Sequence, residues 1–479
     1  MIFLRSLIFI TLGLTSVFSA AGQSDSHQYS FFDSIYLHYR DRLRQKFIAV
    51  DSCVEYPGTN IPAVEIDRKR NLIDWGDANS NMSHYLGILA TEFALNKRNH
   101  KSLETTTKEL FYALLALERL DLYSEAYYRN KVRGINSDTL LIVDTRTDIN
   151  GFHLRDDVSS DFWKKYKGKF DADTVQSVFL TNRQALSQDN IIHNLEGLAL
   201  VAKLTERTNV KNIPVFFYTP LIPTYLQKHR IWEGDTVDFP RWAQNLSHRY
   251  LSILYHANAK RLPQKYLGLK THWYLSDPIQ STLVPEGSGK DLDLALFYNY
   301  GIRKAVDNIT YNPTTSHPGF LKKDGFIFKI LFCYRITMIS NKTILFQLPF
   351  DDYKLRSLAT LGNVMGVETY RRLILYRNVS PVYSYEHFPL IWLILHADKT
   401  GFQLSEPEIE TERCYYLNLF CDIPTEGPTS NNSTQWRITS RLVWPENQNR
   451  HLASVSEFSG MDFMLLYNLF RLTLTEKPF

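Results

Sequence analysis

Hydrophobic residues recur at intervals of three and four through most of the chain, with polar residues on the positions between them. This spacing is typical of helices that bury one face and expose the other. It predicts about eleven helices, which cover 31–48, 79–96, 101–122, 187–208, 239–257, 291–308, 325–339, 353–365, 369–377, 386–397 and 460–474. The short polar turn 97–100 joins two of them, so we expect these two to pack as an antiparallel hairpin.

The helix expected after Ser187 gathers its polar residues in its first two turns. Ser187 is a suitable N-cap, and Asp189 follows in the first turn, where the helix dipole favours an anion. Asp189 and His193 are four residues apart and therefore share a face. Apolar residues follow on more than one face, as far as Val201. We expect a buried helix that presents a carboxylate, an amide and an imidazole at its N-terminal end.

The last expected helix, 460–474, is apolar nearly all round. A helix without a polar face is normally buried, so we expect this one to close the fold against an N-terminal helix. Its deletion is expected to expose a large apolar face and to cause aggregation.

Long segments separate the helices, at 126–157, 260–289 and 400–444, and the last contains strand-like runs at 414–419 and 435–443. No Gly/Ser-rich or Pro-rich stretch, charge block or fixed-period repeat divides the chain. The sequence therefore predicts an all-α fold over residues 23–479. We expect a single α/α toroid of about six helical hairpins with long loops and minor β segments. The alternative is an irregular helical domain followed by a small C-terminal region that contains strands.

Residues 1–22 have the features of a secretory signal peptide. Arg5 supplies the positive charge, residues 7–18 form a short apolar core, and residues 20–22 are small enough for cleavage. We therefore expect the mature chain to begin near Gln23 and to be exported to the periplasm or out of the cell. No other apolar run approaches the roughly eighteen residues that suggest a membrane span.

Composition excludes several classes of function. The net charge of +4 is small for 479 residues, and no dense run of Lys and Arg indicates a nucleic-acid surface. The segment 285–291 lacks the first Gly of a Walker motif, and no apolar strand precedes it. We therefore expect no nucleotide and no other cofactor. His193 and Asp189 are too few for a metal site. The oligomeric state stays open.

Four cysteines are too few for a disulfide scaffold. Cys414 and Cys421 either pair across a short loop in an oxidising compartment or remain two separate buried thiols.

Four stretches resemble a family of exported proteins of Bacteroidetes-type bacteria with α/α-toroid, six-hairpin-glycosidase-like folds. They are Asp74-Trp75-Gly76-Asp77-Ala78-Asn79, Gly151-Phe152-His153-Leu154-Arg155-Asp156-Asp157, Ser187-Gln188-Asp189 and Ser459-Gly460-Met461-Asp462-Phe463-Met464-Leu465-Leu466-Tyr467-Asn468. The resemblance implies a funnel at one end of the toroid that acts on a carbohydrate. It assigns no catalytic residue.

Glycoside hydrolysis needs one protonated and one ionised carboxyl group beside the scissile bond. Asp156 and Asp157 are the candidates for the general acid, because crowding two carboxylates raises the pKa of one. Neighbouring Asp residues usually point apart, so either of them can instead accept hydrogen bonds from its own loop. Asp189 or Asp77 is the candidate partner carboxylate. Asp77 alternatively caps the helix that begins near Asn79.

The candidates for sugar binding are His193, Arg155, Trp75, Gln188 and Trp273. His193 is equally well explained as a core histidine. A polysaccharide lyase is the near alternative to a hydrolase, with His193, a tyrosine and Arg155 as base and charge neutraliser. A non-catalytic glycan-binding or envelope protein is the alternative from another class.

In a helical toroid, the loops at one end of the ring converge on its axis. We therefore expect Asp156 or Asp157, Asp189 and Asp77 to share one cleft, where helix N-termini favour an anionic or hydroxyl-rich ligand. Gathered carboxylates repel each other. Replacing Asp157 or Asp189 by Asn is therefore expected to leave the melting temperature unchanged or to raise it.

Overall fold

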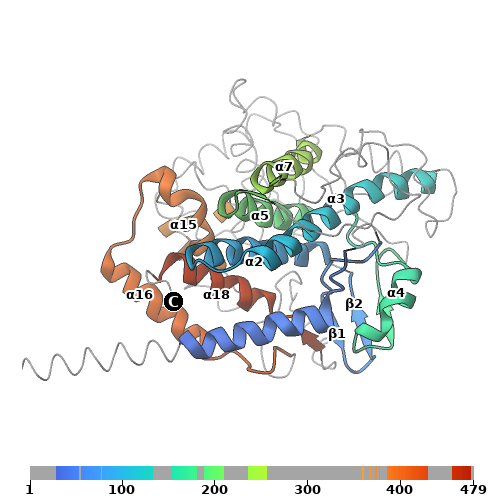
Figure 1. Ribbon diagram of the computed structural model, residues 1–479, viewed down its shortest axis with the longest axis horizontal. Helices are drawn as coiled ribbons and strands as arrows, with labels where there is room; N and C mark the ends of the chain where they lie inside the picture. The colour runs from blue at the N-terminus through green and yellow to red at the C-terminus, as the bar shows by residue number, and fades with distance from the viewer. Residues whose placement is uncertain are drawn as a thin grey trace, which may run out of the picture.

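The computed structural model describes most of the N-terminal half of the chain and three later segments (Figure 1). These residues are 29–52, 56–76, 78–132, 153–180, 188–209, 236–255, 359–360, 367, 370–371, 373–374, 377, 386–429 and 456–475, with the backbone alone at 122, 124–132, 188–192, 248, 251–255 and 399. In this part 64% of residues are helical and 9% lie in strands, so it is mostly helical, as an all-α class requires. The expected signal peptide, the helices at 291–308 and 325–339 and the strand-like run at 435–443 lie outside the described residues.

Most of the described helices follow the hydrophobic pattern, with α4 (Ser160–Tyr166) and α16 (Glu406–Phe420) as exceptions. They are residues 29–42, which continue into the π-helix η1 (Leu43–Phe47), then α2 (Ala78–Arg98), α3 (Glu104–Val132), α4 (Ser160–Tyr166), the 3₁₀ helix η3 (Lys167–Lys169), α5 (Gln188–Leu204), α7 (Phe239–Tyr255), α15 (His387–Thr400), α16 (Glu406–Phe420) and α18 (Met461–Thr473). Six expected helices beyond the first are thereby confirmed: α2, α3, α5, α7, α15 and α18. The long segment expected from residue 126 begins later, because α3 continues to Val132.

The strand expected at 414–419 was wrong, because these residues belong to helix α16. A capping box fixes the start of this helix: the Ser405 N–H donates to the Glu408 carboxylate over 2.8 Å, with Pro407 beside it. Such a box marks the start of a helix, and it outweighs the strand-like pattern of residues 414–419. Tyr416 and Phe420, spaced by one turn, then fall on the buried face.

Two small sheets were missed by the sequence pattern. In the larger one the strand order is β3 (Thr174–Gln176), β2 (Leu72–Asp74), β1 (Glu65–Asp67) and β6 (Ser456–Phe458). β1 pairs antiparallel with both neighbours, and β2 pairs parallel with β3. β2 leads directly into α2, and β6 leads into α18. The sheet therefore holds the N-terminal ends of these two helices on the same side of the molecule.

Helices α2 and α5 run in the same direction. Gly197 of α5 lies against Ser83 of α2, and one turn further along Gly87 of α2 lies against Leu200 of α5. A Cβ atom at position 197 would lie 2.7 Å from the Ser83 carbonyl oxygen, so only glycine permits this approach. The expectation of a buried helix here is confirmed, because α5 is covered by α2, α7 and α15.

Two further helices share that direction. Along α2, residues Gly87, Thr91 and Arg98 meet successive positions of α18 at Leu465, Asn468 and Arg471. The first residue of α15, His387, lies near His84 of α2 and the start of α18, and the far end of α15 reaches α5 through a Lys203–Asp398 ion pair of 2.6 Å. Helices α2, α5, α15 and α18 therefore bring their N-terminal ends to one end of the fold.

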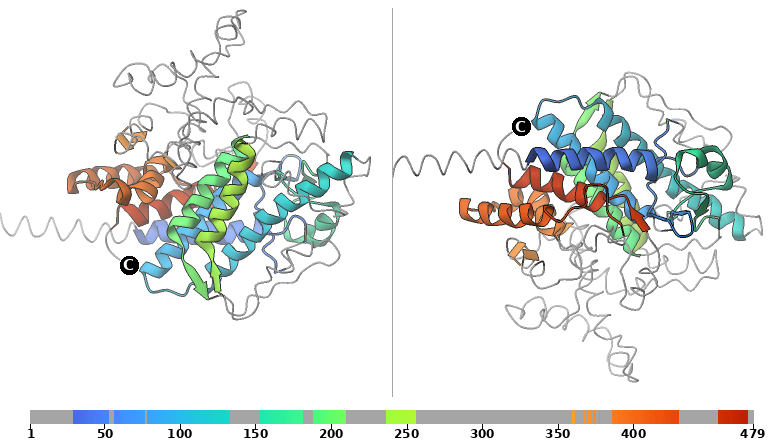
Figure 2. Two further views of the ribbon diagram at one scale, coloured as in Figure 1. Left: turned by 90° about the horizontal axis from the view of Figure 1, so that it is seen from above. Right: turned by 90° about the horizontal axis from the view of Figure 1, so that it is seen from below.

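Three of these four helices, α2, α5 and α18, pack against a neighbour that runs the opposite way. α3 returns along α2 after the short turn predicted from the sequence, and α7 returns along α5 after the hairpin β4 (Arg207–Asn209) and β5 (Thr236–Asp238), as Figure 2 shows. α16 returns along α18, with Phe420 5.7 Å from Phe463 and Tyr416 6.0 Å from Phe470 between ring centroids.

The N-terminal helix 29–42 also runs antiparallel to α18. Tyr39 packs against Phe463 at the start of α18, and Asp33 accepts hydrogen bonds from Tyr467 and Arg471 further along. All residues of α18 from Met461 to Arg471 are buried. The expectation that the C-terminal helix is buried against an N-terminal helix is therefore confirmed, whereas the closure of a ring stays a prediction.

Candidate functional site

The four helices that share one direction have the same internal pattern: polar residues at the N-terminal end and apolar residues after it. In α2 the polar end holds Asn79, Asn81, Ser83 and His84, and in α5 it holds His193, Asn194 and Glu196. All of these side chains are at most 2% exposed. α15 begins with His387, and α18 has Asp462 in its first turn. Buried polar groups are concentrated where the four N-terminal ends meet.

Three histidines from three helices form a row through this end of the fold, which we call the histidine row: His193, His84 and His387. The ring of His84 lies 6.3 Å from that of His193 and 6.1 Å from that of His387, measured between centroids. The Nε2 atom of His387 lies 2.8 Å from the Asp462 carbonyl oxygen. The row therefore connects the second turns of α5 and α2 with the first turns of α15 and α18.

The segment 153–158 joins the same end of the fold. The Asn79 N–H donates to the Arg155 carbonyl over 3.0 Å, and the Asn79 side chain donates to the Leu154 carbonyl over 2.9 Å. Asn194 donates to the Asn79 side chain and lies 3.4 Å from Nε2 of His153. The structure thus brings three separate stretches together, as expected: the start of α2, the start of α5 and the Asp156–Asp157 segment.

Asp156 is fully buried and accepts hydrogen bonds from two backbone N–H groups and a serine hydroxyl. Its carboxylate receives the Val158 N–H at 3.1 Å, the Val178 N–H at 2.9 Å and the Ser177 hydroxyl. Burial raises the pKa of Asp156 to about 7, although these three donors act in the opposite direction. The bond to Val158, two residues on, is the loop-capping alternative drawn from the sequence.

Asp157 points the other way and forms a buried ion pair. Its Oδ2 atom lies 2.6 Å from Nε of Arg119 on α3, and its Oδ1 atom accepts the Gly58 N–H at 2.8 Å. The Asp157 side chain is 0% exposed and that of Arg119 is 4% exposed. Arg119 also donates to the Thr59 carbonyl over 2.8 Å. The ion pair ties together α3, the turn at 56–60 and the segment 153–158.

Trp75 is also a core residue, so the expectation that it binds sugar is corrected. Its side chain is 0% exposed, and its indole N–H donates to the Ile61 carbonyl over 3.2 Å. Phe162 and Phe170 pack edge-on against the ring. A stacking platform needs an exposed ring face, and Trp75 has none.

The remaining candidates divide into two groups. Arg155 is partly buried, and His193 is 2% exposed within the histidine row. Gln188 and Asp189 form the first two residues of α5, but their side chains lie outside the described residues, as do Asp77 and Trp273. Asp77 directly precedes α2 in the sequence. The proposed convergence of Asp77 and Asp189 with the other carboxylates therefore stays a prediction.

Two carboxyl groups that the sequence analysis did not single out lie at the same end of the fold. Glu386 is the N-cap residue of α15 and is partly exposed, whereas Asp462 in α18 is buried. Burial raises the pKa of each to about 7, and the charge of Glu386 raises that of Asp462 further. Both therefore exist substantially in the protonated form at neutral pH.

The missed residues had a detectable signal. The polar run Asn79 to His84 precedes an apolar run, just as the polar start of α5 does, and Ser459 to Asp462 precedes the apolar α18. A comparison of the helix starts would have shown that these polar runs share one pattern and are candidates for one site. Within the described residues, no three His, Cys, Asp or Glu side chains are arranged to hold a metal ion. None of the described helices is long and apolar enough to cross a membrane.

The thiols of Cys414 and Cys421 lie on one helix, α16 with its C-cap, and not on either side of a loop. Each thiol donates a hydrogen bond to the residue four positions earlier. Cys414 donates to the Glu410 carboxylate over 3.5 Å, and Cys421 donates to the Leu417 carbonyl over 3.3 Å. Both residues are exposed, so the expectation of buried thiols was wrong.

Comparison with known proteins supplies no further constraint on this site. No family model, no curated protein and no solved structure matches the chain. The function therefore has to be argued from the geometry of the four helix ends.

Proposed function

We propose that the chain is an exported carbohydrate-active protein with an α/α-toroid fold, most simply a glycoside hydrolase. The direction of the helices supports the toroid. An α/α toroid consists of inner helices that run one way and outer helices that return the other way. Helices α2, α5, α15 and α18 fit the inner set, and α3, α7, α16 and the helix 29–42 fit the outer set.

The observation that carries the proposal is the gathering of buried His, Asn, Asp and Glu side chains where four helices begin. Free N–H groups and the helix dipole favour anionic and hydroxyl-rich ligands at such ends. A core that needed only stability would place apolar residues there, since buried polar groups must all find partners. Further along their length, the same four helices do place apolar residues in the core.

Within this site we propose Glu386 as the general acid. Its carboxyl group is largely buried at the start of α15, and this burial raises its pKa to about 7, which keeps a proton available near neutral pH. Asp189, in the first turn of α5, is the proposed partner carboxylate, with Asp77 before α2 as the second choice. Asp156 and Asp157 then have a structural role beside the site: Asp156 accepts backbone hydrogen bonds, and Asp157 forms the ion pair with Arg119. The histidine row lies between Glu386 and α5.

A panel of polysaccharides tests the proposal. Product is assayed as new reducing ends and as absorbance of unsaturated uronates. A hydrolase produces reducing ends alone, a lyase produces both signals, and a binding protein retains the polysaccharide in affinity electrophoresis without producing either. The lyase outcome would shift the chemistry to His193 and Arg155, as the alternative drawn from the sequence has it.

Variants assign the roles once a substrate is found. Glu386→Gln and Asp189→Asn are each expected to lower kcat at least a hundredfold with the fold intact, because general acid–base catalysis contributes about 10²–10⁴-fold. The matched controls are Glu410→Gln, on the exposed face of α16, and Asp161→Asn, an exposed residue of α4. Wild-type turnover in Glu386→Gln would remove Glu386 from the mechanism.

A further inference from the structure

Helix α15 begins without a capping side chain of its own. Its N-cap residue, Glu386, makes no side-chain hydrogen bond to the first turn, although the polar residues preferred at this position normally do so. Among the described residues, the buried Oε2 atom of Glu386 has no hydrogen-bond partner. The placement of this carboxyl group therefore depends on what holds the backbone of residue 386.

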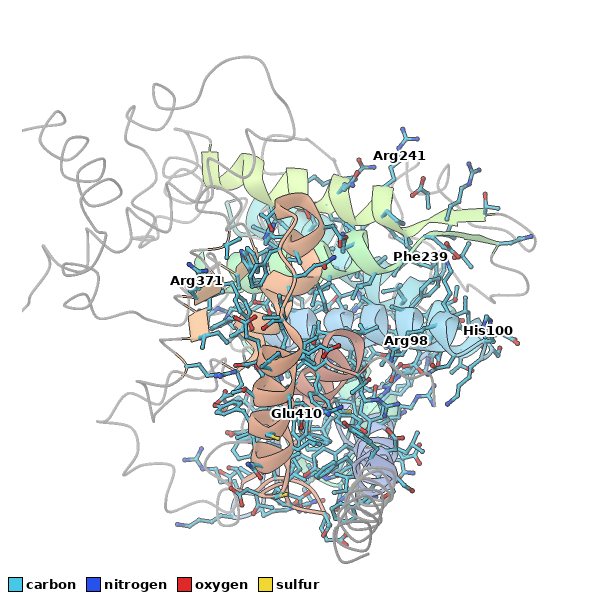
Figure 3. The ribbon with its side chains drawn as sticks, turned by 90° about the vertical axis from the view of Figure 1, so that its left-hand side faces the viewer. Arg98, His100, Phe239, Arg241, Arg371 and Glu410 are labelled. Atoms are coloured by element: carbon cyan, nitrogen blue, oxygen red, sulfur yellow. The ribbon has the colours of Figure 1, made fainter. Side chains whose placement is uncertain are left out.

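A hydroxyl group from the neighbouring helix holds this backbone. Tyr416 on α16 donates its O–H to the Glu386 carbonyl over 2.8 Å. Tyr416 is fully buried, and the rings of Phe420 and Phe470 pack against it. Figure 3 shows the side of the molecule on which α15 and α16 lie, with Glu410 labelled on α16. The core thus fixes the Tyr416 hydroxyl, and this hydroxyl fixes the turn that begins α15.

Arg377, which precedes α15 in the chain, orients the Tyr416 hydroxyl. Its Nη1 atom lies 3.3 Å from that oxygen. Because a guanidinium group only donates hydrogen bonds, the tyrosine proton is directed to the Glu386 carbonyl. The Arg377 side chain is 3% exposed, donates two hydrogen bonds to the Glu412 carboxylate and lies 3.8 Å from the centroid of the Tyr415 ring. A guanidinium that is paired and stacked in this way has little freedom to turn.

Three groups from three parts of the fold face the Glu386 carboxyl group electrostatically: Arg377, Tyr415 of α16 and Asp462 of α18. Burial raises the pKa of Glu386 to about 7, and the positive charge of Arg377 acts in the opposite direction. Burial and the charge of Glu386 raise the pKa of Tyr415 to about 12, so this residue is neutral near pH 7. Asp462 and Glu386 disfavour each other's ionised form. Among the described residues, Arg377 is the one cation that acts on Glu386.

We propose that Arg377 and Tyr416 are positioning residues for Glu386. Tyr416 holds the turn in which the carboxyl group lies, and Arg377 holds Tyr416 and limits how strongly burial favours the protonated form. This inference rests on the proposed role of Glu386 as general acid. A general acid needs a fixed position beside the scissile bond and a pKa near the working pH. Neither positioning residue has to touch the substrate.

The first experiment needs no substrate. Infrared difference spectra, recorded with and without Glu386→Gln in each background, follow protonation of Glu386 between pH 5 and 9. Arg377→Met with Glu412→Gln removes both charges of the ion pair, and we expect the Glu386 midpoint to rise by roughly one pH unit, as for a carboxylate that loses a nearby cation. Arg377→Lys keeps the charge and should restore a midpoint near that of the wild type. The control is Arg371→Met, an exposed arginine labelled in Figure 3, which should leave the midpoint unchanged.

The second experiment uses a substrate identified by the polysaccharide panel. Tyr416→Phe removes one oxygen atom and should lower kcat roughly tenfold or more with KM unchanged, because a misplaced acid slows the reaction without weakening substrate binding. The matched control is Tyr467→Phe, which removes another buried hydroxyl, one that donates to Asp33 over 2.8 Å, and should leave kcat unchanged. Arg377→Met with Glu412→Gln should move the alkaline limb of kcat/KM to higher pH, because the acid stays protonated further.

The two proposals can fail separately. Wild-type turnover in Glu386→Gln would remove Glu386 from the mechanism, whereas a Glu386 midpoint that rises without Arg377 would still support the positioning. An unchanged midpoint after loss of Arg377 and Glu412 would overturn the positioning, as would equal kcat values in Tyr416→Phe and Tyr467→Phe. Far-UV circular dichroism shows whether each variant is folded. If the double variant does not fold, Tyr416→Phe decides alone.

Discussion

Replacing Asp157 by Asn tests the role of the buried ion pair directly. The substitution keeps the shape of the side chain and an oxygen that can accept the Gly58 N–H. It removes the negative charge that lies 2.6 Å from Nε of Arg119, a side chain only 4% exposed. Arg119 cannot lose its proton at ordinary pH, so a full positive charge would remain buried without its anion.

The magnitude follows from measurements on comparable pairs. Removing one partner of a buried ion pair typically destabilises a protein by about 3–5 kcal/mol. This is a large fraction of the free energy of unfolding of an ordinary domain. The sequence analysis expected Asp157→Asn to leave stability unchanged or to raise it, on the assumption of gathered catalytic carboxylates. The observed ion pair predicts the opposite sign.

Urea denaturation followed by tryptophan fluorescence measures the effect. The control is Asp161→Asn, which removes an ion pair with Lys164 in which both side chains are more than three-quarters exposed, and the midpoint should not move. A second variant, Asp157→Asn with Arg119→Met, removes both charges and should recover part of the lost stability. A midpoint of Asp157→Asn equal to wild type would refute the reasoning, since it would mean that Arg119 is not stabilised by this carboxylate.

Three further predictions follow from the fold. Gly197→Ala should lower the free energy of unfolding by about 1–3 kcal/mol, because overpacking would force α5 away from the Ser83 backbone. Gly168→Ala, with no atom within 4 Å of the new Cβ, should leave the urea midpoint unchanged. Asp156, Glu386 and Asp462 have pKa values raised to about 7, so the folded state binds their protons more tightly than the unfolded state. The contribution of these three groups to stability should therefore be complete below the unfolded pKa, near 4, and be lost as pH rises through 7. Urea midpoints from pH 5 to 8 measure this, and a flat profile would contradict it. Truncation after Glu457 should give aggregates in light scattering, because it exposes the partners of α18; a monodisperse, cooperatively unfolding fragment would speak against this.

The helices could be predicted from the sequence because their signal is local. Seven expected helices occur within the described residues, and both α5 and α18 are buried as their apolar faces implied. The four-stranded sheet could not be predicted, because its strands are three residues long and two of its three pairings, β1 with β6 and β2 with β3, join positions far apart in the chain. α16 was misread because the alternation at 414–419 was weighed without the capping box at Ser405.

The expected convergence of the candidate carboxylates on one cleft stays a prediction, although three of the stretches that carry them lie together. The sequence analysis placed carboxylates near the starts of helices, and the segments that contain them do meet there. It could not assign Asp157, since its partners Arg119 and Gly58 are 38 and 99 residues away. It also did not weigh His84, His387 or Glu386, whose surroundings come from other helices.

The pairing of the helix 29–42 with α18 has a consequence for the order of folding. Asp33 and Tyr467 are separated by 434 residues, whereas Asn96 and Thr106 in the α2–α3 hairpin are separated by 10. Closing the longer loop costs roughly 3 kcal/mol more in chain entropy, and contacts of such high sequence separation slow folding. We therefore expect the hairpins to form early and the docking of the two distant helices to be the last and rate-limiting step. Until then the aromatic face around Phe463 stays open, so a chaperone that shields this face would raise the yield of refolding without altering the final structure.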